Sequence, residues 1–185
     1  MKNYFSKLGW LTVIGLVLAV GLSFFVHPAL ALVGVAGMIL DERLEFADAT
    51  ALDTTGAATK LVGDVIDLGA ASRDIGQGEP LYLCIQVDTA VTSAGDATVA
   101  FELASDAQAA IAVDGSATSH FKTAAIGKAN LVTGYRAVMV ALPSGTYERY
   151  LGILATVGTA ALTAGKVNAF LTKDPNGWKA YPDGI

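Results

Sequence analysis

The sequence predicts an all-β protein built as an antiparallel sandwich or barrel. Apolar and polar residues alternate with period two in several short segments, and turn-forming residues separate these segments. In 81–88 every odd position is aliphatic, so these side chains share one face of a strand. Helical periodicity is scarce, and no internal repeat or linker is present.

The alternating segments predict strands in chain order at 64–68, 81–88, 98–103, 136–142, 147–157 and 166–172. Turns are expected between them at 76–80, 94–96, 114–116 and 143–145, where Gly, Asp, Ser or Pro occur. Segment 41–51 is expected to form a helical turn or two. The Ala-rich segment 105–112 suits a short helix or a loop.

The first 37 residues form an apolar N-terminal extension to the β domain of residues 38–185. Lys2 and Lys7 precede an apolar run over 8–26, and the small-x-small sequence Ala29-Leu30-Ala31 follows. This arrangement is typical of a secretion signal, and the run is also close to the length of a membrane anchor. In a third interpretation Met38 is the true first residue and the upstream stretch is accessory.

The β domain is acidic. Residues 38–185 hold 10 basic and 17 acidic residues, a net charge of −7. DNA-binding surfaces need clustered positive charge, so nucleic acid is not an expected partner. The one cysteine, Cys84, excludes an internal disulfide and a cysteine-based zinc site. We expect Cys84 to be a small packing residue or part of a protein–protein face.

The motifs of an enzyme are missing, so no cofactor, metal or catalytic residue is expected. Asp114, Ser116 and His120 lie within seven residues, but no nucleophile-elbow motif is present, and we interpret His120 as an exposed loop residue. Segment 53–56, Asp-Thr-Thr-Gly, is expected to be a strand-to-loop turn. Only converging carboxylates remain open as an enzymatic alternative.

Several segments resemble one protein family. They are Met38-Ile39-Leu40-Asp41, the sequence VIDLG at 65–69, RDIGQGEPL at 73–81, LCIQV at 83–87 and DPNGW at 174–178. Together they resemble the capsid cement (decoration) proteins of short-tailed bacteriophages of the Bordetella phage type. The first 37 residues depart from that family.

The resemblance implies a jelly-roll sandwich that self-associates as a dimer or trimer on the outer capsid surface of the virion. It would be a structural protein assembled in the host cytoplasm, where it bridges capsomers of the major capsid protein without catalytic residues. The alternative function is an exported or membrane-tethered binding module, adhesin-like or carbohydrate-binding. A membrane is a partner only if residues 1–37 act as an anchor.

Contacts with a partner are expected from the loop 73–80, the strand segment 147–150 and the C-terminal tail. Aromatic and arginine side chains dominate many protein interfaces. The expected contact residues are Arg73, Asp74, Glu79, Tyr147, Arg149, Tyr150, Trp178 and Tyr181. For the four aromatic residues among them, packing in the core is the open alternative.

Overall fold

The structure, a computed structural model, describes residues 41–69, 75 and 78–176. In chain order its elements are the 3-10 helix η1 (Glu42–Leu44), β1 (Glu45–Ala51), β2 (Ala58–Asp67), β3 (Tyr82–Thr92), β4 (Thr98–Asp106), β5 (Thr118–Lys122), β6 (Ile126–Gly127), the 3-10 helix η2 (Lys128–Asn130), β7 (Arg136–Ala141), β8 (Tyr150–Gly158) and β9 (Ala164–Thr172). All of them belong to the unit Leu40–Ile185. The extension 1–37 lies outside the described residues. Among those residues, no helix is long and apolar enough to cross a membrane.

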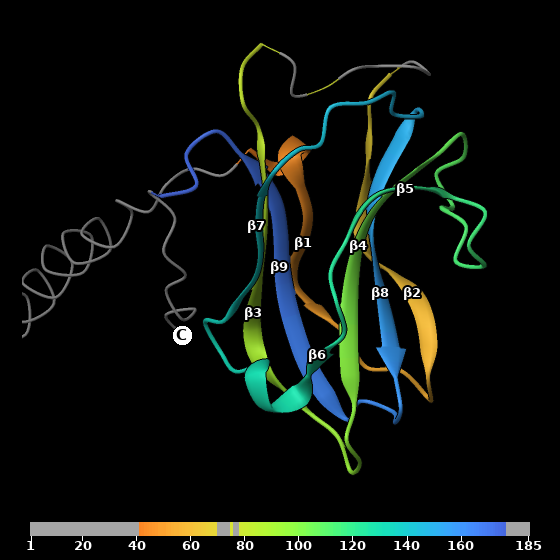
Figure 1. The fold of residues 1–185 in the computed structure, drawn as a ribbon, viewed down its shortest axis with the longest axis vertical. Helices are drawn as coiled ribbons and strands as arrows, with labels where there is room; N and C mark the ends of the chain where they lie inside the picture. The colour runs from red at the N-terminus through yellow and green to blue at the C-terminus, as the bar shows by residue number, and fades with distance from the viewer. Residues whose placement is uncertain (1–40, 70–74, 76–77, 177–185) are drawn as a thin grey trace, which may run out of the picture. The chain divides into compact units, whose positions relative to one another are not determined.

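The strands form two antiparallel sheets that face each other (Figure 1). One sheet has the order β1-β9-β3-β7, and the other has the order β2-β8-β4-β5 with β6 beside β4. Apart from the two-residue β6, the chain changes sheet at every connection except that between β4 and β5. This is the strand order of a jelly roll. The predicted all-β, jelly-roll-like sandwich is confirmed, and the barrel alternative is wrong because the two sheets do not join.

The core lies between the sheets and follows from the period-two pattern. Leu83, Ile85 and Val87 of β3 are at most 1% exposed, as are Val99, Phe101 and Leu103 of β4. Alternate residues of a strand point to opposite faces, so these two sets meet across the sandwich. The turns expected at 94–96, 114–116 and 143–145 all lie between strands, and segment 53–56 lies in the turn from β1 to β2.

Segment 41–51 does not form the expected α-helical turns. Its first residues form η1, with the Asp41 carboxylate accepting the Arg43 N–H at 3.0 Å, and the remainder is β1. β1 pairs with β9, and this pairing buries Phe46 and Ala47. The partner strand lies more than a hundred residues away in the sequence, so local helix propensity does not decide the structure here.

Segment 105–112 is divided between a strand and a loop. Ser105 and Asp106 complete β4, and the chain then folds back over the outer face of the sheet. Ile111 packs there against Ala104 and Leu154 in a small second cluster. The Asp106 carboxylate accepts the N–H groups of Gln108 and Ala112, at 3.1 Å each, and so holds the base of the loop. The short strands β5 and β6 that follow were not predicted.

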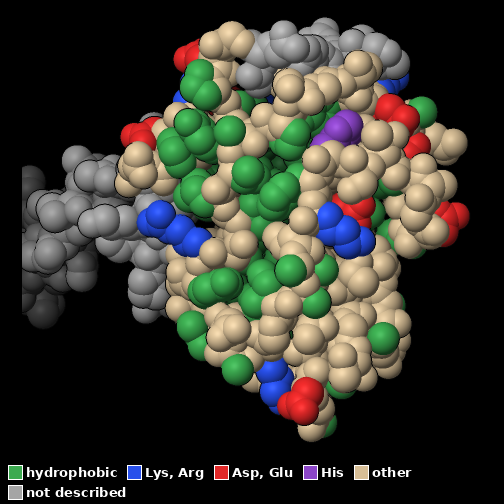
Figure 2. Space-filling model, in the orientation of Figure 1, with side chains coloured by type: hydrophobic (Ala, Val, Ile, Leu, Met, Phe, Trp, Pro, Cys, Tyr) green, Lys and Arg blue, Asp and Glu red, His purple; other side chains and the backbone are tan. Residues whose placement is uncertain are grey.

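The two open sides of the sandwich differ. On one side β1 and β2 pack against each other, so their inward-facing Phe46 and Val62 are at most 1% exposed. On the other side Val140 of β7, Phe121 of β5 and Ile126 of β6 remain partly exposed. Figure 2 shows hydrophobic side chains along the middle of the molecule, in the region where Figure 1 places β7 and β6.

Cys84 is a buried packing residue of β3. It faces away from the inter-sheet core, yet its side chain has no exposed surface. Burial raises the pKa of the thiol to about 11, and the charge of Arg136 opposes this only in part. A thiol with so high a pKa is a poor nucleophile at neutral pH. The packing interpretation of Cys84 is therefore the one that the structure supports.

Candidate functional site

One end of the sandwich gathers the described segments that were expected to contact a partner. Strands β2, β4, β7 and β9 end here, and β3, β5 and β8 begin here, as their antiparallel registers require. The loops around 78–81, 107–117 and 142–149 therefore share this end, which we call the loop end (Figure 1). Glu79 is far in the sequence from Arg149 and Tyr150, and the topology places it at the same end as these two neighbours.

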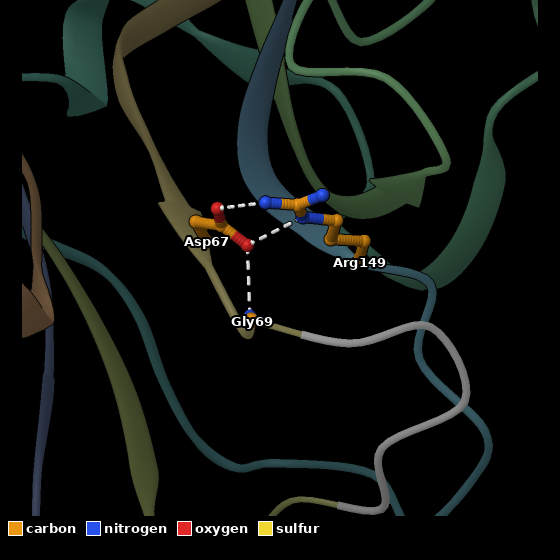
Figure 3. Close-up of polar contacts among 3 residues, drawn as sticks. All are labelled: Asp67, Gly69 and Arg149. Carbon is orange, nitrogen blue, oxygen red and sulfur yellow. Dashed lines mark hydrogen bonds and ion pairs between the residues drawn. The ribbon is translucent and has the colours of Figure 1, made fainter.

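Arg149 is a charged side chain of the loop end that is held by hydrogen bonds. It binds Asp67 at the end of β2 through two parallel hydrogen bonds, Nε to Oδ1 and Nη2 to Oδ2, both 2.9 Å long (Figure 3). The Gly69 N–H also donates to Asp67 Oδ1, at 2.8 Å. The hydrogen bond from Arg149, and then that from Gly69, lower the pKa of Asp67 to about 2.

This pair also orients its neighbour Tyr150. The Arg149 guanidinium carbon lies 5.0 Å from the centre of the Tyr150 ring, within the range of a cation–π contact. The side chains of Arg149 and Asp67 remain 46% and 43% exposed. The group thus presents a planar cation, a carboxylate and an aromatic ring at the surface. Asp67 was not among the expected contact residues, because nothing local in the sequence indicates that it lies beside Arg149.

Glu79 forms a second exposed ion pair at the loop end. Lys173, just after β9, donates to Glu79 Oε2 at 2.7 Å, and the two side chains are 64% and 70% exposed. Such a pair contributes little to stability and leaves both charges accessible. Four further expected contact residues, Arg73, Asp74, Trp178 and Tyr181, lie outside the described residues.

The expectation for Tyr147 needs correction. Its side chain has no exposed surface, its ring stacks on His120 with the centroids 4.0 Å apart, and its hydroxyl donates to the Pro143 carbonyl. A fully buried ring offers nothing to a partner, so Tyr147 supports the loop end from within. Tyr150, three residues later, is the partly exposed ring of the two.

His120 is not the expected exposed loop residue. It lies on β5, is partly buried, and its Nε2 is 2.7 Å from Ser105 Oγ on β4. The Glu148 N–H donates to the same hydroxyl at 3.1 Å, while Thr118 donates to the Glu148 carboxylate at 3.1 Å. Ser105 has no exposed surface, so a substrate cannot reach this serine–histidine pair without rearrangement of the fold.

The position of His120 predicts a pH-dependent stability. Burial lowers the pKa of His120, and the charge of Glu148 opposes this only in part. The unfolded chain therefore binds a proton more readily than the folded chain. The free energy of unfolding should be constant above the ordinary histidine pKa of 6.5 and fall as the pH drops below it.

Urea unfolding at several pH values between about 8 and 5.5 checks this prediction. The variant His120→Gln, which keeps a polar side chain of similar length without titrating there, should show a flatter profile than the native chain. Parallel profiles for the two proteins would show that His120 does not cause the loss.

A hollow of about 510 Å³ lies beside β1 and is lined by Glu42, Glu45, Asp48 and Asp64, among others. Burial, and then the neighbouring Asp48 and Glu42, raise the pKa of Glu45. Within the described part of the chain, no three His, Cys, Asp or Glu side chains lie close enough to hold a metal ion.

Sequence comparison identifies the family of the chain. No curated protein matches the chain at a significant level. The family model Bbp16 matches residues 46–171, which span the structure from β1 almost to the end of β9. This match covers more than half of the chain and nearly all of the jelly roll. The chain therefore belongs to the Bbp16 family, a Bordetella phage protein family.

Proposed function

We propose that the chain is a structural virion protein that binds the outside of an icosahedral phage capsid and cements neighbouring capsomers of the major capsid protein. The observation that carries this proposal is membership of the Bbp16 family over almost the whole jelly roll. The sequence segments that resemble phage cement proteins point the same way. The proposal includes assembly in the host cytoplasm, self-association as a dimer or trimer, and no enzymatic activity.

The exposed charged side chains of the loop end support this proposal. Charged groups at a surface give specificity to a contact with a partner of complementary charge. Arg149, Asp67 and Glu79 are exposed and fixed in position by hydrogen bonds. The acidic β domain is compatible with a location on the outer surface and offers no reason to expect contact with packaged nucleic acid.

The experiment combines the purified full chain with empty shells assembled from the major capsid protein. We expect the chain to sediment with the shells, to saturate at a fixed ratio, and to raise the temperature at which the shells break open. Failure to sediment with shells over a range of salt concentrations would contradict the proposal.

The alternative function, an exported or membrane-tethered binding module, is motivated by the signal-like residues 1–31. The intact mass and N-terminus of the native protein distinguish the two functions. A native chain that begins at Leu32 indicates cleavage after Ala31 and export. An uncleaved chain, or one that begins at Met38, found in purified virions supports the capsid.

A charge reversal at the loop end provides a sharper prediction. Arg149→Glu should weaken binding to shells at least about tenfold, because it places two carboxylates side by side where the native chain presents a planar cation. The fold should persist, since the pair is exposed. The binding constant is measured by sedimentation with shells.

Lys166→Glu is the matched control. Lys166 is exposed at the start of β9, at the opposite end of the sandwich, and its reversal changes the net charge by the same amount. If both variants bind alike, net charge rather than the loop end governs the contact.

A further inference from the structure

The four edge strands of the two sheets are not equally protected against pairing with another chain. β1 has two register shifts and a positive φ of 43° at Ala49, and β2 has a register shift between Val62 and Ile66. β5 has only five residues and a register shift of its own. Such irregularities prevent an edge from accepting a further strand.

β7 is the regular edge. Its residues Val138 to Ala141 pair with β3 without a register shift, and the Leu142 N–H donates to the Leu81 carbonyl at 2.8 Å. In an antiparallel pair the peptide groups alternate in direction. Those of Val140 and Val138 therefore point toward β3 like that of Leu142, whereas those of Met139 and Ala141 point away from β3, where no strand of the described residues pairs. Over 136–141, β7 contains no proline, glycine or acidic residue to block this edge.

The surface around the β7 edge is apolar. Inward-facing Val140, Phe121 and Ile126 remain partly exposed because both sheets end here. Tyr135, directly before β7, is 38% exposed, and Val132 is 52% exposed. Two of the three exposed large hydrophobic residues of the described chain thus lie in the segment that leads into this edge. Apolar contacts of this kind add to main-chain hydrogen bonds when a strand is added.

The charge of this region indicates the chemistry of the added strand. Residues 115–147 contain Lys122, Lys128 and Arg136 and no acidic residue, although the protein as a whole carries a net charge of −5. Lys122 pairs with Glu102 of β4 at 2.9 Å. The Lys128 ammonium donates to the Ser93 carbonyl at 2.9 Å, which holds it in place without neutralising its charge. A second copy docked through the same side would bring positive charges together. An acidic segment would complement them.

We propose that β7 accepts an extended, acidic segment of another protein as a fifth strand beside the sheet β1-β9-β3-β7. The inference rests on the proposed function, since the segment would belong to the major capsid protein. The added strand would accept the Met139 and Ala141 N–H groups and cover Tyr135 and Val140. Lys128 would lie near its acidic side chains.

Amide hydrogen exchange of the full chain, free and bound to shells of the major capsid protein, tests strand addition. In the free chain the Met139 and Ala141 amides should exchange much faster than those of Val138 and Val140, because only the latter are bonded within the sheet. On shells the Met139 and Ala141 amides should slow at least about tenfold. If these two amides exchange alike in the free and the bound chain, β7 accepts no strand.

Two variants test the same contact by affinity. Met139→Pro removes the outward donor and leaves the bonds to β3 in place, because proline is tolerated on an edge strand where its nitrogen faces outward. Lys128→Glu opposes an acidic partner. Each variant should weaken shell binding at least about tenfold. The free variant should still unfold in a cooperative thermal transition, which shows that it is folded. Lys166→Glu, at an exposed position of β9, is the charge-matched control.

The outcomes separate this inference from the proposed function. If the native chain does not bind shells, the proposed function fails. If the native chain and Met139→Pro bind shells equally, cementing stands and the β7 inference fails. If Met139→Pro abolishes self-association, measured by sedimentation velocity, but not shell binding, the added strand comes from a second copy and the acidic partner is wrong.

Discussion

Gly63→Ala is expected to destabilise the jelly roll by about 3 kcal/mol or more. Gly63 lies in β2 where this strand passes β1, and its φ of +66° is one that L side chains rarely adopt. A Cβ built there would lie 1.9 Å from the Phe46 carbonyl oxygen, which is a backbone atom and cannot move aside cheaply. The strained φ and the clash both cost free energy, and a typical point substitution costs about 1 kcal/mol.

Urea unfolding of the variant measures this effect. Gly56→Ala is the matched control, because nothing lies within 4 Å of a Cβ at Gly56 and its φ is not in the left-handed range. Its free energy of unfolding should stay within about 0.5 kcal/mol of the native value. A loss at Gly63 no greater than that at Gly56 would mean that β1 and β2 do not pack as described.

Tyr147→Ala is expected to destabilise the chain by about 3–5 kcal/mol, the usual cost of truncating a buried aromatic ring. The ring is fully buried and stacked on His120, so its removal leaves a cavity under the loop end. Thermal and urea unfolding measure the loss. Tyr147→Phe keeps the ring and removes the hydroxyl that donates to Pro143, so it should cost only about 0.5–1.5 kcal/mol.

Tyr150→Ala is the comparison that distinguishes a core residue from a surface residue. Tyr150 is partly exposed, so its truncation should cost less stability than that of Tyr147. If Tyr147→Ala leaves stability unchanged but weakens binding to shells, the ring contacts the partner and the expectation drawn from the sequence was right after all.

The expected strands are observed where alternate apolar residues of the sequence face the core between the two sheets. Segments 98–103 and 166–172 lie within observed strands, and 81–88 does so apart from Leu81, because alternate apolar side chains of each segment face the core between the sheets. β5 and β6 were missed, since they are short edge strands with little apolar alternation. β2 was expected only over 64–68 but begins at Ala58, where polar Thr59 and Lys60 obscure the pattern.

The candidate site was predicted only in part. Arg149, Tyr150 and Glu79 are accessible, as a surface role requires, whereas Tyr147 is buried although it lies in the same segment. The spacing of residues in the sequence could not show that Tyr147 is buried and Tyr150 partly exposed. The difference depends on His120 and Pro143, whose positions follow from how β5 and the loop 142–149 pack.

The sequence by itself determined the all-β class, the acidic character of the β domain and most of the turns, because alternation, charge and turn chemistry are local properties of a chain. Only the tertiary structure decided the order of the strands, the pairing of Arg149 with Asp67 and the contrast between the protected β1–β2 edges and the open β7 edge. The physical reason is that pairing in a jelly roll joins residues far apart in the sequence. Arg149 and Asp67 are 82 residues apart, and no local pattern records which distant strand a segment will meet.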